Sequence, residues 1–382
     1  MIPLSIPNLD GKEAEYVTQC IKTGWISSAG AFVGEFESKI SDYTKSTYAI
    51  ACMNGTVGLQ TALNVLGVSH KDVILTTNLT FVATLNAISY TGAEPILFDI
   101  NEETWQIDLG LVEEWLNENT YLKEDNDKIY SYTRISNKRI GAILPVHVLG
   151  GLVEIDHLLK ISEKFHIPII EDSTEALGSK YKGKSAGTFG DFGVFSFNGN
   201  KIISTGGGGM LVTENLNLGE KAKHLSTTAK TDPLDYFHDE IGYNYRLVNV
   251  LAAIGVAQME QFPKILQKKK LIDRIYRKEL VGLNDIVFQE HIKDSDPNCW
   301  LFTFRTIEMR KLLNYLNTNG IQSRPFWTPM NRLPMYSKLD YVTKSDTTGQ
   351  IFSECISVPS SSNLTEEQQE VVINTIKKFY KK

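Results

Sequence analysis

Among the lysines of this sequence, Lys201 has the surroundings that best suit an amine acting as a nucleophile. It follows the apolar run Phe192–Phe197, which predicts a buried strand, and it precedes four consecutive glycines, Gly206–Gly209. Burial near a strand end favours the neutral, nucleophilic form of an amine, and glycines let a bulky planar ligand approach the backbone. An exposed lysine in a flexible glycine hairpin explains the segment equally well, so both interpretations stay open on this segment alone.

Two adjacent carboxylates, Glu171 and Asp172, end another strand candidate, Ile167–Ile170. The carboxyl ends of parallel strands form the ligand-binding edge of α/β enzymes. Side chains alternate along a strand, so we expect the two carboxylates on opposite faces, one in a site and the other a solvated strand end. Taken alone, a solvated end is the commoner explanation for either residue.

A phosphate-binding site is predicted at Asn54-Gly55-Thr56. These residues connect the strand candidate Tyr48–Cys52 to the helix candidate Val57–Leu66. Glycine allows close approach of the backbone, the N–H groups of the first helical turn are free, and Thr56 adds a hydroxyl donor. An ordinary helix N-cap is the alternative, and these three residues do not decide between the two.

The segment Gly178–Ser185 matches the phosphate-loop pattern G-x-x-x-x-G-K-S, but its context argues against that function. A working phosphate loop turns directly into a helix whose first N–H groups face the phosphates. Here Gly187, Gly190 and Gly193 follow, and each would cost a helix about 1 kcal/mol. We therefore predict a glycine-punctuated hairpin and not a nucleotide-hydrolysing site.

The 382 residues carry a net charge of −6, with 39 basic against 45 acidic side chains. This balance argues against partners such as nucleic acid or an acidic membrane, so an anionic ligand must be held locally. The four cysteines are widely spaced and form no Cys-x-x-Cys pair, which indicates a reducing compartment. No apolar run reaches membrane-spanning length, and the N-terminus lacks signal-peptide character. We expect a cytoplasmic protein without a metal centre.

Apolar runs alternate with helical patterns between residues 48 and 213, which predicts an α/β domain with a largely parallel sheet. The strand candidates are Tyr48–Cys52, Val73–Thr76, Ile96–Ile100, Ile140–Val146, Ile167–Ile170, Phe192–Phe197 and Gly209–Val212. Asn117–Arg139 interrupts the alternation and is expected to be a surface excursion.

The second part of the chain begins with a helical bridge. An apolar helix is expected at Leu247–Phe262, and a lysine-rich helix follows Pro263. Short strand candidates, two helices and proline-rich loops follow, which indicate a smaller α+β unit. We expect a large domain at residues 1–260 and a small C-terminal domain at residues 261–382.

Nine short segments together carry the strongest signal of the sequence. They are Gly24–Ser28, Asn54–Thr56, Thr80–Thr84, Pro145–His147, Glu171–Gly178, Gly187–Asp191, Phe195–Phe197, Asn200–Lys201 and Gly242–Arg246. In this order they resemble the DegT/StrS family of sugar-nucleotide aminotransferases, a branch of the fold-type I pyridoxal phosphate (PLP) enzymes. The resemblance covers nearly the whole chain. It implies a large PLP-binding α/β domain with a mainly parallel sheet, a smaller C-terminal α+β domain, and a homodimer with shared active sites.

The resemblance implies which residues hold the cofactor phosphate. Gly55, Thr56 and Ser196 would bind it from one chain. Asn244 of the partner subunit would reach the same phosphate.

The resemblance also implies roles around the cofactor ring. Phe81 would stack on the pyridine ring, Asp172 would pair with its protonated nitrogen, and Glu175 would lie near its hydroxyl group. Lys201 would form the Schiff base with the cofactor. His147 belongs to a family motif, but it is assigned no chemical step, because a structural histidine at a strand end is at least as consistent with the sequence.

The family implies transfer of an amino group from glutamate to the 4-keto group of a nucleotide-linked deoxysugar, in surface-glycan biosynthesis. Ser27, Ser28, Arg324 and Trp327 are the candidate substrate contacts. Glu175 stands where most relatives have glutamine, as in the subgroup that acts on UDP-linked 4-keto-6-deoxy-N-acetylhexosamines, and many relatives have a His-Tyr pair near Arg324. The expected acceptor is therefore the UDP-linked sugar, and a dTDP- or GDP-linked keto-deoxysugar is the alternative.

Two other readings of the family resemblance remain. PLP-dependent sugar dehydratases of this family have a histidine in place of the lysine, so Lys201 argues against that activity. A non-catalytic PLP-binding regulator is the alternative outside enzymes, and the intact Lys201 and Asp172 argue for catalysis.

Overall fold

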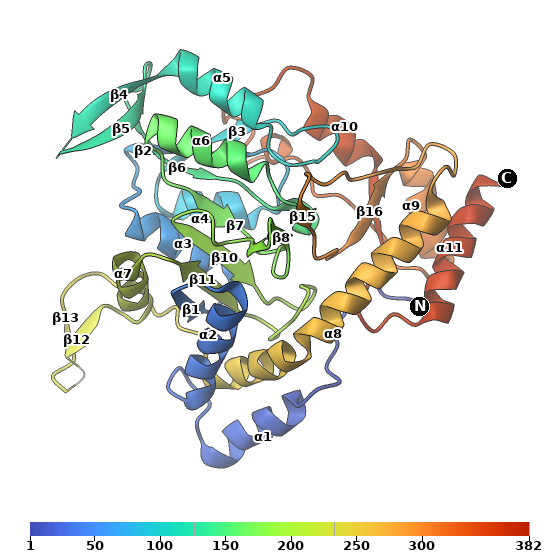
Figure 1. Ribbon diagram of the computed structural model, residues 1–382, viewed down its shortest axis with the longest axis horizontal. Helices are drawn as coiled ribbons and strands as arrows, with labels where there is room; N and C mark the ends of the chain where they lie inside the picture. The colour runs from blue at the N-terminus through green and yellow to red at the C-terminus, as the bar shows by residue number, and fades with distance from the viewer. Residues whose placement is uncertain (126, 233, 382) are drawn as a thin grey trace.

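The computed structural model describes residues 1–125, 127–232 and 234–381, and a sheet with helices on both faces forms its centre (Figure 1). The sheet order is β3, β2, β6, β7, β10, β11, β1. The bounds are β1 (Tyr48–Cys52), β2 (Asp72–Thr77), β3 (Glu94–Phe98), β6 (Arg139–Leu144), β7 (Ile170–Asp172), β10 (Phe192–Ser196) and β11 (Gly209–Thr213). Of these seven strands, β11 alone runs in the opposite direction to the others. The predicted α/β fold with a largely parallel sheet is confirmed.

The start of β7 differs from the prediction. The strand begins at Ile170, whereas the apolar pattern placed its start at Ile167. Pro168 has no N–H to donate to a ladder, and pairing with β6 begins as an isolated bridge between Ile143 and Ile169. The strand therefore extends through both carboxylates, Glu171 and Asp172.

Additional strands join the sheet at two places. At the start of β6, the antiparallel hairpin of β4 (Thr120–Asp125) and β5 (Lys128–Thr133) pairs with this strand through Tyr132 and Arg139. This hairpin occupies the predicted surface excursion and gives it regular structure. At the β3 edge, β18 (Tyr341–Val342) pairs in parallel with β3, so a segment of the C-terminal region joins the large sheet.

Helices cover both faces of the sheet, as the apolar clusters show. One face packs against α3 (Gly55–Val65), α4 (Ala83–Tyr90) and α7 (Leu216–Ser226). The other face packs against α5 (Leu109–Asn119) and α6 (Ile155–Phe165) on one half and against α2 (Ala31–Thr44) and α8 (Asn249–Leu280) on the other. The first helix, α1 (Glu13–Thr23), lies against α8.

Helix α8 is continuous over 32 residues and includes Pro263. The sequence placed a break at this proline, and the structure corrects that expectation. The domain boundary expected at residues 260 and 261 falls inside α8, which runs diagonally from the large sheet to the C-terminal unit (Figure 1). The division into two domains stays a prediction.

The C-terminal unit is built on a four-stranded antiparallel sheet. Its order is β14 (Val287–Phe288), β16 (Phe302–Arg305), β19 (Cys355–Val358), β17 (Arg324–Pro325). The helices α9 (Met309–Thr318) and α11 (Glu366–Tyr380) share an apolar cluster with this sheet and with the end of α8, and α10 (Thr347–Glu354) precedes β19. The chain's N-terminal segment also belongs here, because Ile2 bridges to Ile321.

The remaining elements are short. They are β8 (Lys180–Tyr181), β9 (Lys184–Ser185), β12 (Lys230–Asp232), β13 (Phe237–His238), β15 (Ser295–Asp296) and the 3₁₀ turns η1 (Val148–Gly150) and η2 (Met330–Arg332). Strands β8 and β9 pair antiparallel, which confirms the hairpin predicted for the phosphate-loop pattern. None of the helices in the described residues is both long and apolar enough to span a membrane.

Candidate active site

A cavity of about 310 Å³ lies where β1, β2, β7 and β10 end, at the edge where open α/β sheets bind ligands. Seven residues with predicted cofactor roles line it: Gly55, Thr56, Phe81, Asp172, Glu175, Ser196 and Lys201. These residues come from segments that are far apart in the sequence. The fold therefore gathers all the predicted cofactor residues except Asn244 around one cavity.

The N-terminus of α3 forms one wall of this cavity. The Asn54 side chain caps the helix by accepting a hydrogen bond from the Val57 N–H at 3.0 Å. The N–H groups of Gly55 and Thr56 lie in the first helical turn and have no hydrogen-bond acceptor within the helix, so they stay available to a ligand. A Cβ on Gly55 would lie 2.9 Å from Thr174 Cγ2, so the close approach here requires glycine. This wall is suited to an anion such as a phosphate group.

Asp172 presents its carboxylate to the same cavity. Thr84 donates a hydrogen bond from its hydroxyl to Asp172 Oδ2 at 2.8 Å, and the Thr174 N–H donates to Oδ1 at 3.2 Å. A second hydroxyl, that of Thr80, lies 2.8 Å from the Thr84 hydroxyl. The carboxylate is therefore held in one orientation, and it can face a cation placed in the cavity.

Glu171 points to the opposite face of the sheet, as the alternation predicted, but it is not a solvated strand end. Its side chain is fully buried. One oxygen accepts from the Phe189 and Gly190 N–H groups at 2.6 and 2.8 Å, and the other accepts from the Gly187 N–H at 2.8 Å. Glu171 therefore ties the glycine-rich segment before β10 to the sheet.

His147 shares this buried environment and makes no contact with the cavity. Its Nε2 lies 2.9 Å from a Glu171 oxygen, and its Nδ1 faces the Val153 N–H at 3.5 Å. An acceptor role for Nδ1 places the proton on Nε2, which then donates to the carboxylate. This geometry supports the structural role of His147.

Lys201 points into the cavity between a carboxylate and an aromatic ring. Its Nζ lies 3.5 Å from Glu175 Oε1 and 4.3 Å from the centre of the Trp300 indole. Glu175 accepts a second hydrogen bond from the Leu149 N–H at 2.8 Å. Burial raises the pKa of Glu175, while the neighbouring Lys201 and the Leu149 N–H oppose the rise. The lysine side chain is 12% exposed, so the exposed-lysine alternative is wrong.

Five predicted residues lie outside this cavity: Ser27, Ser28, Asn244, Arg324 and Trp327. The two serines are exposed between α1 and α2, and Asn244 is exposed on the segment before α8. Arg324 is exposed on β17, with no ion-pair partner among the described residues. Trp327 stacks on Trp300 with ring centres 6.4 Å apart, so one aromatic ring separates it from Lys201.

Three residues of this site were given no role by sequence reasoning. Thr84 lies in a quoted motif together with Thr80, whose hydroxyl it contacts and which stands just before α4. Trp300 and Asn298 gave no such signal. Asn298 is buried and donates to the Glu175 and Leu177 carbonyl oxygens at 2.7 and 2.9 Å, which anchors the C-terminal unit beneath the site.

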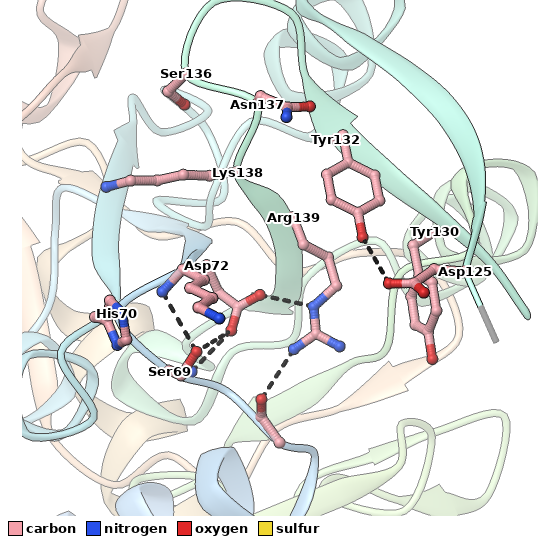
Figure 2. Close-up of a pocket in the computed structure, with 12 residues that line it drawn as sticks. Ser69, His70, Asp72, Asp125, Tyr130, Tyr132, Ser136, Asn137, Lys138 and Arg139 are labelled. Atoms are coloured by element: carbon pink, nitrogen blue, oxygen red, sulfur yellow. Dashed lines mark hydrogen bonds and ion pairs between the residues drawn. The ribbon is translucent and has the colours of Figure 1, made fainter.

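A larger cavity, of about 620 Å³, lies where β2 and β6 begin (Figure 2). An ion pair between Arg139 Nε and Asp72 Oδ1 at 2.6 Å crosses it, and Arg139 also donates to the Gly67 carbonyl. No residue with a predicted role lines this cavity. Size alone therefore does not mark the active site.

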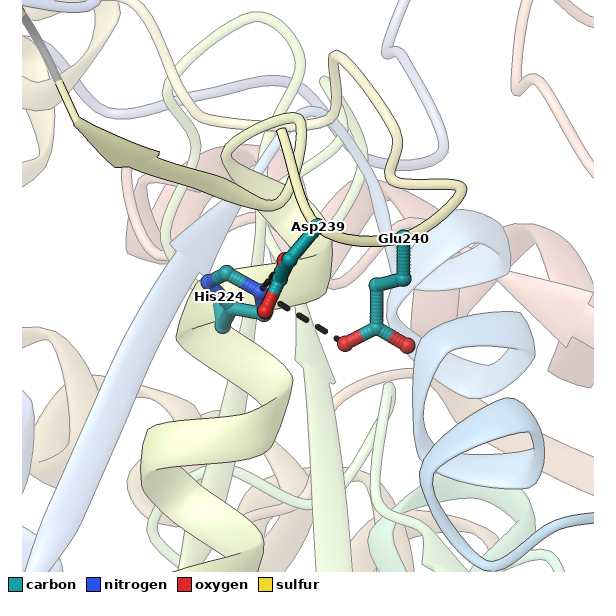
Figure 3. A group of neighbouring side chains, drawn as sticks. All are labelled: His224, Asp239 and Glu240. Carbon is teal, nitrogen blue, oxygen red and sulfur yellow. Dashed lines mark hydrogen bonds and ion pairs between the residues drawn. The ribbon is translucent and has the colours of Figure 1, made fainter. Parts of the chain in front are cut away.

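A second cluster of ionisable groups combines His224, Asp239 and Glu240 (Figure 3). His224 Nε2 lies 2.7 Å from Asp239 Oδ1 and 3.5 Å from Glu240 Oε1, and the hydrogen bond from His224 lowers the pKa of Asp239. Lys221 also pairs with Glu240. Surface ion pairs account for this cluster.

Comparison with known proteins identifies the family. The model of the DegT/DnrJ/EryC1/StrS aminotransferase family matches residues 7–377. The chain belongs to this family. It is a sugar-nucleotide aminotransferase, which confirms the predicted enzyme class and argues against the nucleotide-hydrolase alternative.

Relatives with two different names match nearly the whole chain. GDP-perosamine synthase of Escherichia coli O157:H7 is 37% identical over 99% of this chain and 98% of its own, and that of Vibrio cholerae is 34% identical over 100% and 99%. UDP-4-amino-4,6-dideoxy-N-acetyl-beta-L-altrosamine transaminase of Campylobacter jejuni (strain 81-176) is 30% identical over 98% and 96%. The PLP form of Spr1654 from Streptococcus pneumoniae, described as a sugar aminotransferase, superposes with a TM-score of 0.88 at 25% identity, covering 100% and 98%.

The family implies PLP as the cofactor, and the cavity fits it. A helix N-terminus with free N–H groups suits the phosphate, and a fixed carboxylate suits a protonated ring nitrogen. Lys201 is the one lysine among the described residues that line the cavity. The donor set of this chain therefore matches the phosphate, the ring nitrogen and the aldehyde of this cofactor.

Proposed function

We propose that the protein transfers the amino group of glutamate to the 4-keto group of a GDP-linked 4-keto-6-deoxyhexose, with PLP held at Lys201. The observation that carries this proposal is the convergence of Lys201, Asp172 and the free N-terminus of α3 on one cavity. PLP supplies an aldehyde that accepts an amine and a ring that delocalises the electron pair left when a carbon next to the amino nitrogen loses its proton.

Each cavity residue has a proposed task. Gly55, Thr56 and Ser196 bind the phosphate through N–H and hydroxyl donors. Asp172 keeps a proton on the ring nitrogen, because its carboxylate stabilises the cationic form. Phe81, exposed in this chain, covers the ring and excludes water from it.

Lys201 would have a second task once its amine is free. Its Nζ would then hold and move the proton that the substrate carbon loses. Glu175 lies close enough to orient the amine, and its position beside the lysine is consistent with contact to the ring hydroxyl. Two half-reactions of this kind move one amino group from donor to acceptor.

The choice of acceptor rests on the relatives. The GDP-perosamine synthases share 33–37% identity with this chain, compared with 30% for the UDP-linked transaminase. A UDP-linked 4-keto-6-deoxy-N-acetylhexosamine is the second candidate, because Glu175 and the Arg324–Trp327 segment resemble the subgroup that uses it. Either diphosphate needs local positive charge, and Arg324 is an exposed cation without an ion-pair partner among the described residues.

The acceptor prediction is tested by comparing kcat/KM for GDP-, UDP- and dTDP-linked 4-keto-6-deoxysugars with glutamate as the donor. We expect the GDP-linked sugar to be preferred by tenfold or more, which corresponds to about 1.4 kcal/mol in transition-state binding. The Arg324→Ala variant serves as an internal comparison. Removing this arginine should act mainly by raising the KM for the acceptor. A tenfold preference for the UDP-linked N-acetyl sugar would replace the proposal with the second candidate.

We also propose that two chains share each active site. Asn244 is exposed and outside the cavity of its own chain, although the family resemblance places it at the cofactor phosphate. Its segment is well supported, since Tyr243 and Tyr245 stack with ring centres 4.8 Å apart and both hydrogen-bond to α3. A fixed segment that presents Asn244 away from its own site is suited to completing the site of a second copy.

Mixing two inactive variants tests this arrangement. Lys201→Ala and Asn244→Ala chains that exchange subunits should form heterodimers with one intact site, assembled from Lys201 of one chain and Asn244 of the other. Random mixing should restore about one quarter of the wild-type activity, because half of the dimers then carry one working site of two. Absence of recovery, despite exchange confirmed by native mass spectrometry, would contradict the shared site.

A further inference from the structure

Trp300 approaches Lys201 from the C-terminal unit. The indole is 2% exposed, and its face lies 4.3 Å from the lysine Nζ. Its Nε1–H donates to the carbonyl oxygen of Asn200 at 2.7 Å. One side chain therefore contacts both the amine of Lys201 and the backbone of the preceding residue.

The position of Trp300 is fixed by several further contacts. Its backbone N–H donates to Asn298 Oδ1 at 3.0 Å, and its carbonyl oxygen accepts from the buried ammonium group of Lys269. Trp327 stacks on the indole, with ring planes 14° apart. A ring held on this many sides cannot move away from the lysine at small cost, so its face is preorganised to receive a cation.

We propose that Trp300 is a positioning residue that holds the amine of Lys201 whenever this amine is not bonded to the cofactor. This inference rests on the proposed function, in which Lys201 alternates between a bonded and a free state. In the structure the ammonium group lies between the Trp300 face and the Glu175 carboxylate. This position keeps the lysine within the cavity, and the anchored Asn200 carbonyl holds the loop that carries it.

A purely structural role for Trp300 predicts a different behaviour. A core tryptophan would stabilise the fold without changing the reactivity of one lysine. Trp105 provides the matched control, because it is equally buried and packs edge-to-face on Phe326 without contacting Lys201. The two tryptophans therefore separate general loss of packing from loss of the lysine contact.

The test measures acetylation of Lys201 in the full-length, cofactor-free protein at constant pH. Acetic anhydride is the probe, peptide mass spectrometry gives the rate, and the exposed Lys338 is the internal reference. The probe must reach the amine, and the aromatic face covers and binds it, so Trp300→Leu should accelerate modification of Lys201 by about fivefold. Trp105→Leu should leave this rate at the wild-type value, and equal acceleration in both variants would overturn the proposal.

A second variant keeps the shape of the side chain. Site-specific replacement of Trp300 by a ring-fluorinated tryptophan withdraws electron density from the face and retains the N–H, and it should accelerate acetylation by about twofold. A wild-type rate in this folded variant would also overturn the proposal. The measurement uses neither cofactor nor substrate, so it is independent of the turnover and cofactor-mapping experiments that test the proposed function.

Discussion

Replacing Lys201 by alanine is expected to lower kcat by about 10³-fold or more, because one side chain both bonds the cofactor and moves the proton. The side chain contacts Glu175 and Trp300 within the cavity and supports no backbone hydrogen bond through its ammonium group. The fold should therefore be retained, with a melting temperature close to that of the wild type. Steady-state turnover of glutamate with a keto-deoxysugar acceptor measures the loss.

The matched control is Lys138→Ala, which removes a surface lysine just before β6 that pairs with Glu94 of β3 at 2.6 Å. This variant should keep wild-type turnover, since surface ion pairs contribute about 0–1 kcal/mol to stability and this one lies away from the cavity. Borohydride reduction of the wild-type protein should place the reduced cofactor on the Lys201 peptide. Recovery of the cofactor on another lysine would show that the assignment is wrong.

The sequence allowed the main cavity residues to be predicted because each lies at a position marked by local chemistry. Asn54 to Thr56 begin a helix after a buried strand, Asp172 ends another strand, and Lys201 precedes a glycine run. Parallel strand ends meet at one edge of a sheet, so these local signals converge in space without any knowledge of the contacts. The placement of seven predicted residues around one cavity follows from this topology.

Contacts supplied by distant segments had no such local signal. Trp300 contacts Lys201 across 99 positions of the sequence, and the Lys269 side chain on α8 fixes the Trp300 carbonyl. The hydrophobic periodicity of the sequence indicates neither contact. Glu171 looked like a solvated strand end, because its three N–H donors lie in a glycine-rich segment 16–19 residues further along the chain. Pro263 looked like a helix boundary, but tertiary packing along α8 outweighs the lost hydrogen bond.

Asp172→Asn is expected to lower turnover on the order of 10²-fold or more, since it removes the negative charge that keeps the ring nitrogen protonated. The fold should tolerate the change. The new amide oxygen can still accept from the Thr174 N–H, and the Thr84 hydroxyl can accept from the amide nitrogen while it donates to Thr80. Rates of both half-reactions with glutamate and acceptor measure the loss, and wild-type rates in both would contradict the proposed role.

Glu171→Gln is the neighbouring control, and it should show the opposite behaviour. The new amide nitrogen cannot accept the N–H groups that now bind one carboxylate oxygen, so buried donors lose their partner. This loss should lower the free energy of unfolding by about 1–3 kcal/mol for each unsatisfied group, visible as a lower melting temperature. Because Glu171 faces away from the cavity, turnover of the folded enzyme should fall far less than in Asp172→Asn. Of the two adjacent carboxylates on opposite faces of β7, Glu171 would then support stability and Asp172 would support catalysis. A large loss of activity at unchanged stability in Glu171→Gln would contradict this assignment of roles.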